Sequence, residues 1–168
     1  IRSMPNTPAL VGTGISVLCA GENCRPHHRD QAERILRAAG EVLWLEDETL
    51  MDAVTAVSGS GPAYFFLLTE ALADAGVRLG LNENVARRLA EYTCIGAGAM
   101  LKQTISGQST AGAAELRQRV TSPGGTTQAA LNAFADGKFR ELVYSAVAAA
   151  EHRGNELSLA AGAGVTGR

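Results

Sequence analysis

The sequence predicts a mainly α-helical chain that begins with a short α/β segment. Residues 1–46 alternate between strand-like and helix-like patterns, whereas the residues from Glu48 onward follow helical periodicity. Aromatic residues make up only 5% of the 168 residues, and 19 glycines accompany abundant alanine, which favours closely approaching helices over a β-sandwich. The length fits one domain, or one domain and part of another.

The α/β segment consists of a strand, a helix and a second strand. Residues 14–20 are an apolar, β-branched run and predict a strand. Residues 29–39 predict a charged amphipathic helix that ends at Gly40, and residues 41–45 predict the second strand. Because so few strands cannot cover both faces of a parallel sheet, we expect this segment to be the end of a domain that begins before Ile1.

The rest of the chain predicts a series of helices. A short helix over 50–57 is interrupted by the Ser-Gly-Ser-Gly-Pro run at 58–62, and a long helix follows over 63–79. Asn82 or Asn84 caps the next helix, which runs to about Gln103. Later helical segments are expected over 113–120, 128–134 and 139–150, and a flexible tail over 161–168.

The helix that ends near Gln103 is apolar on all sides in its second half and contains two glycines there. Glycine lowers helix propensity by roughly 1 kcal/mol, so it makes sense where another backbone packs closely. An all-round apolar helix needs more cover than this chain supplies. We therefore predict a helical oligomer with residues 63–79 and 84–103 at the interface.

Charge and cysteine content exclude several classes of function. The net charge of −2 and pI near 5.9 give no basic face, which argues against a nucleic-acid partner. The longest apolar run, 63–68, is too short for a membrane span. The 3 cysteines lack zinc-ligand spacing, so we expect no metal site, and an odd number without a secretory signal predicts a cytoplasmic protein.

The turn at residues 121–127 (TSPGGTT) is the strongest candidate for a ligand site. Ser122 is a suitable N-cap for the helix that follows, and Pro123 suits the first helical position. The backbone amides of Gly124 and Gly125 are open to close approach, and the hydroxyls of Thr126 and Thr127 lie next to them. A helix N-terminus of this kind binds small anions such as a carboxylate. The alternative is an ordinary capped helix.

Four ordered blocks of the sequence resemble the pyrroline-5-carboxylate reductase family. They are residues 2–8 (RSMPNTP), 52–64 (DAVTAVSGSGPAY), 70–76 (EALADAG) and 120–127 (VTSPGGTT). The spacing between them also fits, and the resemblance covers roughly residues 1–157.

The resemblance implies a fold and a reaction. Residues 1–46 would be the C-terminal remnant of a truncated Rossmann domain, residues 47–160 an all-helical dimerisation and substrate-binding domain, and the dimers could assemble further. The implied reaction is reduction of 1-pyrroline-5-carboxylate, a cyclic imine carboxylate, to L-proline with NADPH or NADH. Because most of the cofactor domain would precede Ile1, the alternative is a helical oligomerisation module that has no activity of its own.

The resemblance also implies roles for individual residues. Thr127 would be catalytic, orienting the substrate nitrogen or relaying a proton to it, since a threonine hydroxyl is a poor acid. Substrate-binding residues would be Glu48, Thr55, Ser122, Gly124, Gly125, Thr126 and Thr127. Cofactor-binding residues would be Asn6, Pro62 and Arg119. Each has a simpler structural alternative: a solvated charge for Glu48 and Arg119, a hydroxyl bonded to its own helix for Thr55, turn chemistry for Asn6 and a helix break for Pro62.

Overall fold

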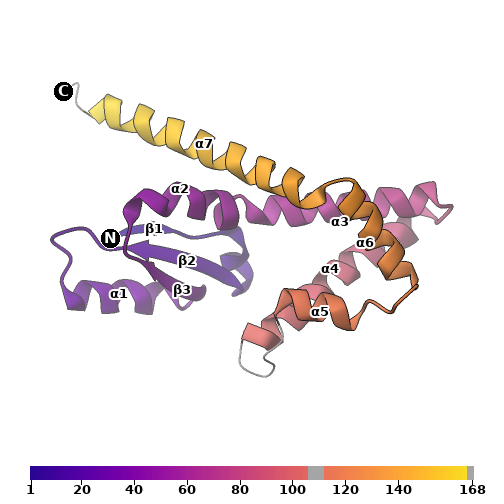
Figure 1. The fold of residues 1–168 in the computed structure, drawn as a ribbon. Helices are drawn as coiled ribbons and strands as arrows, with labels where there is room; N and C mark the ends of the chain where they lie inside the picture. Colours follow the sequence, from indigo (N-terminus) through magenta and orange to yellow (C-terminus); the bar gives the residue numbers. More distant parts are fainter. Residues whose placement is uncertain (106–111, 166–168) are drawn as a thin grey trace. The chain divides into compact units, whose positions relative to one another are not determined.

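The computed structural model describes residues 1–105 and 112–165, with side chains as far as residue 160. Figure 1 shows the order of the helices and strands. The chain divides into one unit made of Ile1–Tyr64 and Val143–Arg168 and a second unit made of Phe65–Leu142.

The first unit contains a three-stranded sheet with strand β2 at its centre. Strand β2 (Gly14–Cys19) pairs antiparallel with β1 (Arg2–Met4) and parallel with β3 (Gly40–Leu45). Helix α1 (Pro26–Leu36) connects the two parallel strands. This crossover confirms the strand, helix and strand predicted from the sequence.

Strand β2 is buried because helices contact both faces of the sheet. On one face, Val17 and Cys19 pack against Met51, which is fully buried. On the other face, Leu18 is 0% exposed and lies beside Trp44 in the parallel register. The indole N–H of Trp44 donates a 2.9 Å hydrogen bond to Glu33 of α1, so α1 covers this face. Because successive side chains of β2 point to opposite faces of the sheet, this strand contributes to the core on both faces.

The start of the parallel pair brings two glycines together. Gly14 lies opposite Gly40 in the register, and Gly40 has a φ of 151°, which disfavours other residues. A Cβ atom at Gly40 would clash with the carbonyl oxygen of Gly14. This close approach explains why residue 40 is a glycine. From the sequence, Gly40 was predicted only to end the helix over 29–39.

Two boundaries in this unit differ from the sequence predictions. Helix α1 begins at Pro26, not at residue 29, because proline is well suited to the first helical position. It also ends at Leu36, and turn residues lead from there into β3. Strand β1 was not predicted, since a run of 3 residues is too short to show alternation.

The segment after β3 is helical but irregular. A 3₁₀ turn, η2 (Glu48–Leu50), leads into α2 (Met51–Val54), and a π-helical turn, η3 (Thr55–Gly59), precedes α3 (Gly61–Arg78). The predicted interruption at residues 58–62 is therefore largely a widened turn within a nearly continuous helical path. A further 3₁₀ turn, η1 (Thr7–Val11), joins β1 to β2.

The second unit is helical throughout its described residues. It contains most of α3, then α4 (Glu83–Ile105), α5 (Ala113–Arg119), α6 (Thr126–Asp136) and the first residues of α7 (Phe139–Val165). Of the two expected caps for α4, Asn82 accepts the 3.0 Å bond from the Asn84 amide. Helices α3 and α4 approach closely at Gly76, where a Cβ atom would lie 3.1 Å from that of Ala86.

Large apolar side chains of α3 and α4 remain exposed in the single chain. Phe65 is 62% exposed and Phe66 is 69% exposed on α3, while Tyr92 is 65% and Ile95 is 63% exposed on α4. Within the described residues, nothing lies within 4 Å of a Cβ atom built at Gly96 or Gly98. These surfaces have the apolar character that the sequence assigned to an oligomer interface.

The last helix is longer than the sequence suggested. Helix α7 continues to Val165, and so extends into the segment that was expected to be a flexible tail. The final part of that predicted tail, 166–168, lies outside the described residues. The sequence suggested an earlier end because Gly162 and Gly164 lower helix propensity, yet α7 runs through both positions.

Candidate functional site

The turn that precedes α6 is built on two glycines with different backbone conformations. Gly124 adopts a left-handed φ of 71°, and Gly125 is extended with φ −81° and ψ 174°. The amide of Gly125 donates a 3.1 Å hydrogen bond to the carbonyl oxygen of Ser122 and closes the turn. Gly125 is the N-cap, and α6 begins at Thr126.

This geometry corrects the sequence prediction in two respects. Ser122 is not the N-cap and Pro123 is not the first helical residue, because the left-handed Gly124 cannot belong to a right-handed helix. The amide of Gly125 is also occupied by Ser122. The donors that the start of α6 offers to a ligand are therefore the amides of Thr126, Thr127 and Gln128.

The first turn of α6 has the properties of an anion site. No side chain caps it, so its first amides have no partner from an N-cap side chain. Thr126 is exposed and Thr127 is half-buried, which leaves two hydroxyls at the same helix end. The partial positive charge of the helix dipole adds to these donors. A small carboxylate matches this set of donors.

Arg119 lies at the C-terminal end of α5. Its guanidinium donates a 2.6 Å hydrogen bond to Glu115, one helical turn earlier. Both side chains are about half exposed, and an exposed pair of this kind contributes at most about 1 kcal/mol. The ion pair satisfies the charge of Arg119 locally, which is the simpler of the two interpretations of this residue.

Thr55 opens the π-helical turn η3 in the first unit. Its hydroxyl donates a 2.9 Å hydrogen bond to the Met51 carbonyl oxygen. This bond is the helix-internal alternative that we considered for Thr55 from the sequence. The bond fixes the side chain and leaves the hydroxyl oxygen able to accept a hydrogen bond from a ligand.

Asn6 connects η3 to the sheet. Its side-chain nitrogen donates a 3.2 Å hydrogen bond to the Ser58 carbonyl oxygen, and its side-chain oxygen accepts a 2.9 Å bond from the amide of Ile15. The structure therefore brings Asn6 to the helical turn that begins at Thr55, and Pro62 follows this turn closely in the sequence. Both ends of the Asn6 amide are engaged by the protein.

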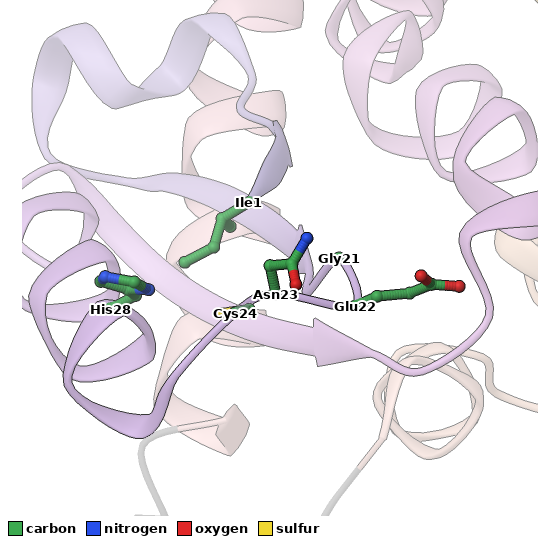
Figure 2. A pocket seen from close by; sticks show the side chains of 6 residues that line it. All are labelled: Ile1, Gly21, Glu22, Asn23, Cys24 and His28. Atoms are coloured by element: carbon green, nitrogen blue, oxygen red, sulfur yellow. The ribbon is translucent and has the colours of Figure 1, made fainter.

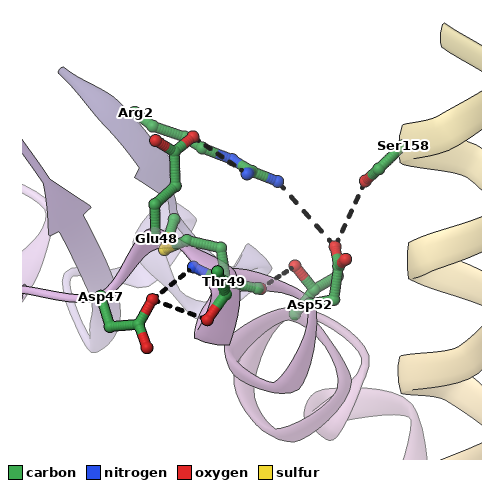
Figure 3. A network of polar contacts seen from close by, with 8 residues as sticks. Arg2, Asp47, Glu48, Thr49, Asp52 and Ser158 are labelled. Atoms are coloured by element: carbon green, nitrogen blue, oxygen red, sulfur yellow. Dashed lines mark hydrogen bonds and ion pairs between the residues drawn. The ribbon is translucent and has the colours of Figure 1, made fainter. Parts of the chain in front are cut away.

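Glu48 belongs to a polar network at the start of α2 (Figure 3). Arg2 contacts Glu48 at 3.2 Å and Asp52 at 3.9 Å, and the hydroxyl of Ser158 donates a 3.3 Å bond to Asp52. The side chain of Glu48 is 57% exposed. Its position agrees with the interpretation of Glu48 as a solvated carboxylate at a helix start.

Asp47 caps the same helix start. The Thr49 hydroxyl donates a 2.6 Å hydrogen bond to the Asp47 carboxylate, and the Thr49 amide donates another at 2.9 Å. The hydroxyl and then the amide lower the pKa of Asp47 below its ordinary value. Asp47 is thus ionised at neutral pH and acts as a structural cap.

Two shallow pockets lie away from the predicted site residues. The first, of about 430 Å³, surrounds the turn between β2 and α1 and is lined by Ile1, Gly21, Glu22, Asn23, Cys24 and His28 (Figure 2). The second, of about 490 Å³, lies on α4 beside Leu89 and Tyr92. Neither pocket includes a residue that the sequence assigned to substrate or cofactor.

The described residues, 1–105 and 112–165, offer neither a metal cluster nor a membrane-spanning helix. In this part, no group of three or more His, Cys, Asp or Glu side chains could hold a metal ion. No helix in the same residues has the length and apolar character needed to cross a bilayer.

Comparison with known proteins identifies the family. The family model for pyrroline-5-carboxylate reductase dimerisation matches residues 48–157, well over half of the chain. The chain belongs to the pyrroline-5-carboxylate reductase family. The match covers the helical path from η2 through most of α7, including both the π-helical turn and the α6 turn.

Individual relatives agree with this family. The chain is 49% identical to the pyrroline-5-carboxylate reductase of Pseudomonas aeruginosa, covering 94% of this chain and 56% of that protein. It is 45% identical to the one from Mycobacterium tuberculosis, covering 95% and 58%, respectively. The chain thus spans little more than half the length of the curated relatives that it matches.

Solved structures of pyrroline-5-carboxylate reductases have the same fold. The Coxiella burnetii structure superposes with a TM-score of 0.84 at 42% identity, over 93% of this chain and 56% of that chain. The Plasmodium falciparum structure, solved with NADP bound, gives a TM-score of 0.78 at 34% identity, over 90% and 60%.

Two residues of structural importance to these sites, Tyr64 and Gln128, were not predicted from the sequence. The hydroxyl of Tyr64 donates a 3.0 Å hydrogen bond to the Ala56 carbonyl oxygen within the irregular turn. Gln128 supplies the third amide of the α6 start. A signal for Gln128 was present, because the left-handed preference of a Gly-Gly pair delays the helix start.

Proposed function

We propose that this chain is the dimerising and substrate-binding part of a pyrroline-5-carboxylate reductase, which reduces the C=N bond of 1-pyrroline-5-carboxylate to give L-proline. Membership of the family supports the reaction. The observation that carries the assignment of the substrate is the start of α6, where amides without a capping side chain meet two threonine hydroxyls. This arrangement matches the single carboxylate of the imine.

The proposed binding mode follows the corrected start of α6. The amides of Thr126, Thr127 and Gln128 hold the carboxylate oxygens, and Gly124 and Gly125 shape the turn that exposes them. Ser122 contributes its carbonyl oxygen to that turn rather than a cap.

Thr127 is the proposed catalytic residue because its hydroxyl stands at the same helix end and can act as both donor and acceptor. It orients the ring nitrogen and passes a proton to it from water. Glu48 and Thr55 remain proposed substrate-binding residues on the resemblance of their surrounding sequences.

NADPH or NADH is the proposed cofactor, and when bound it supplies a hydride to the imine carbon. The described residues fit only part of such a cofactor. The turn between β2 and α1 lacks a glycine-rich phosphate loop, and the amide of Arg25 is bonded to His28 at 3.2 Å. Pro62 and Arg119 are therefore proposed to contact the nicotinamide end alone. Asn6, whose side-chain amide bonds to the protein at both ends, is proposed to support that end indirectly. No pyrophosphate site is assigned to the described residues.

A second copy of this chain is the proposed partner, as a homodimer or a higher oligomer. The exposed apolar faces of α3 and α4 support this proposal, since a monomer would leave them in water. The balanced charge argues against a nucleic-acid partner, and we propose a cytoplasmic location. The same faces favour the alternative of an oligomerisation module without activity of its own.

The test measures oxidation of NADPH and NADH by the full-length protein in the presence of 1-pyrroline-5-carboxylate, with proline detected by mass spectrometry. Light scattering on the same sample gives the oligomeric state. We expect proline in proportion to cofactor consumed, from a dimer or larger assembly. An oligomer that forms no proline with either cofactor would support the module alternative and reject the reductase.

A further inference from the structure

The π-helical turn η3 leaves the backbone carbonyls of Ala56 and Ser58 without their α-helical donors. The amide of Ser60 bonds to the Thr55 carbonyl oxygen at 2.8 Å, so it is not directed at Ala56 as in an α-helix. Pro62 has no N–H, and therefore cannot donate to the carbonyl of Ser58 four residues earlier. The amide of Ala63 is bonded to Ser60 at 3.0 Å.

Two side chains replace the missing donors. The hydroxyl of Tyr64 bonds to the Ala56 carbonyl oxygen at 3.0 Å, and the amide of Asn6 bonds to the Ser58 carbonyl oxygen at 3.2 Å. Ala56 is 0% exposed and Ser58 is half-buried, so an unpaired carbonyl here would be costly. The amide of Ile15 fixes which end of Asn6 faces Ser58, because it donates to the oxygen.

We propose that Asn6 and Tyr64 are positioning residues that hold η3 in the shape that presents the Thr55 hydroxyl to the substrate. The inference rests on the proposed function of Thr55. Thr55 begins the turn, and its carbonyl accepts the π-type bond from Ser60, so a change in the turn moves Thr55 directly. Asn6 acts on the reaction through this turn and not by contact with the cofactor.

The decisive test is a pair of variants in the full-length protein. Asn6→Asp keeps an acceptor for Ile15 and removes the donor to Ser58. Pro62→Ala restores a backbone N–H four residues after Ser58, which can replace the lost donor. We expect Asn6→Asp to lower kcat/KM for the imine about tenfold, and about threefold or less when it is introduced into the Pro62→Ala background.

Two further measurements separate positioning from cofactor contact. The dissociation constant of NADPH should stay within about twofold of wild type in Asn6→Asp. Amide exchange at Ser60 should accelerate about tenfold in Asn6→Asp, and be restored by Pro62→Ala. Tyr64→Phe should accelerate the same amide. The matched control is Thr69→Val, which removes a hydroxyl that donates a 2.8 Å hydrogen bond to the Phe65 carbonyl oxygen. Because that carbonyl keeps its backbone donor in the helix, this variant should leave exchange of the Ser60 amide unchanged.

Weaker NADPH binding in Asn6→Asp with no rescue by Pro62→Ala would overturn the inference in favour of direct cofactor contact. Unchanged exchange at Ser60 would overturn it whatever the activity. Because exchange is measured without turnover, this result stands apart from the proposed function, which fails only if the wild-type protein makes no proline.

Discussion

Replacing Thr126 with proline isolates one backbone donor of the anion site proposed at the start of α6. Proline is tolerated at the first helical position, where its missing N–H has no helical partner. It also requires an extended residue before it, and Gly125 is already extended at φ −81° and ψ 174°. Thr126→Pro should therefore remove the amide without unfolding α6. Thr126→Ala is the control, because it removes the hydroxyl and keeps the amide.

The expected loss follows from the charge of the ligand. A hydrogen bond to a charged group contributes about 1.5–3 kcal/mol, which corresponds to about 10- to 150-fold in affinity. The remaining amides and the helix dipole are retained, so binding is weakened and not abolished. Thr126→Pro should bind a carboxylate ligand weaker than Thr126→Ala by this factor.

The assay compares inhibition by L-proline with inhibition by L-prolinamide, which lacks the carboxylate charge. Thr126→Pro should raise the inhibition constant of L-proline by the stated factor and that of L-prolinamide by about threefold or less. Thermal unfolding should be nearly the same in the two variants. Equal affinity of both variants for L-proline would refute the assignment of the carboxylate to this helix start.

Three other substitutions give distinct outcomes. Thr127→Ala should lower kcat for imine reduction more than it weakens NADPH binding, and an unchanged kcat would remove Thr127 from the reaction. Hydrogen bonds from Trp44, then Arg37, lower the pKa of Glu33 in the folded protein. These bonds therefore stabilise the fold fully above the ordinary glutamate pKa, and the stabilisation is lost as pH falls through the lowered value. Glu33→Gln should flatten this dependence of the unfolding free energy on acid pH, measured by urea unfolding followed through Trp44 fluorescence. Leu18→Ala, at a side chain that is 0% exposed, should lower the free energy of unfolding by about 3–5 kcal/mol, and a loss below about 1 kcal/mol would contradict its place in the core.

Local sequence patterns predicted most of the elements, since these depend on neighbours within one or two turns. The apolar run of β2 and the periodicity of α3 and α4 are examples. The start of α6 was misplaced because a serine followed by proline is also a good helix start. Only the left-handed conformation of Gly124 decides between the two starts.

Contacts between distant residues were beyond the sequence patterns. Asn6 and Ser58 are 52 positions apart, and Ser158 and Asp52 are 106 apart. The sequence did indicate that the Ser58 carbonyl needs another donor, because Pro62 has no backbone N–H to donate to it. It could not show which side chain supplies the replacement, since that depends on how the chain between them folds.

The two irregular helix ends differ in which backbone groups they leave unpaired, and this difference indicates what each can bind. At η3 the helix loses donors, and the chain pairs the resulting carbonyls with Tyr64 and Asn6. At α6 the helix leaves donors, and no side chain caps them. Buried carbonyls must be paired for the fold to be stable, whereas amides at an exposed helix start can bond to water until a ligand replaces it. The paired carbonyls therefore favour a supporting role for η3, and the uncapped amides favour the proposed anion binding at the start of α6.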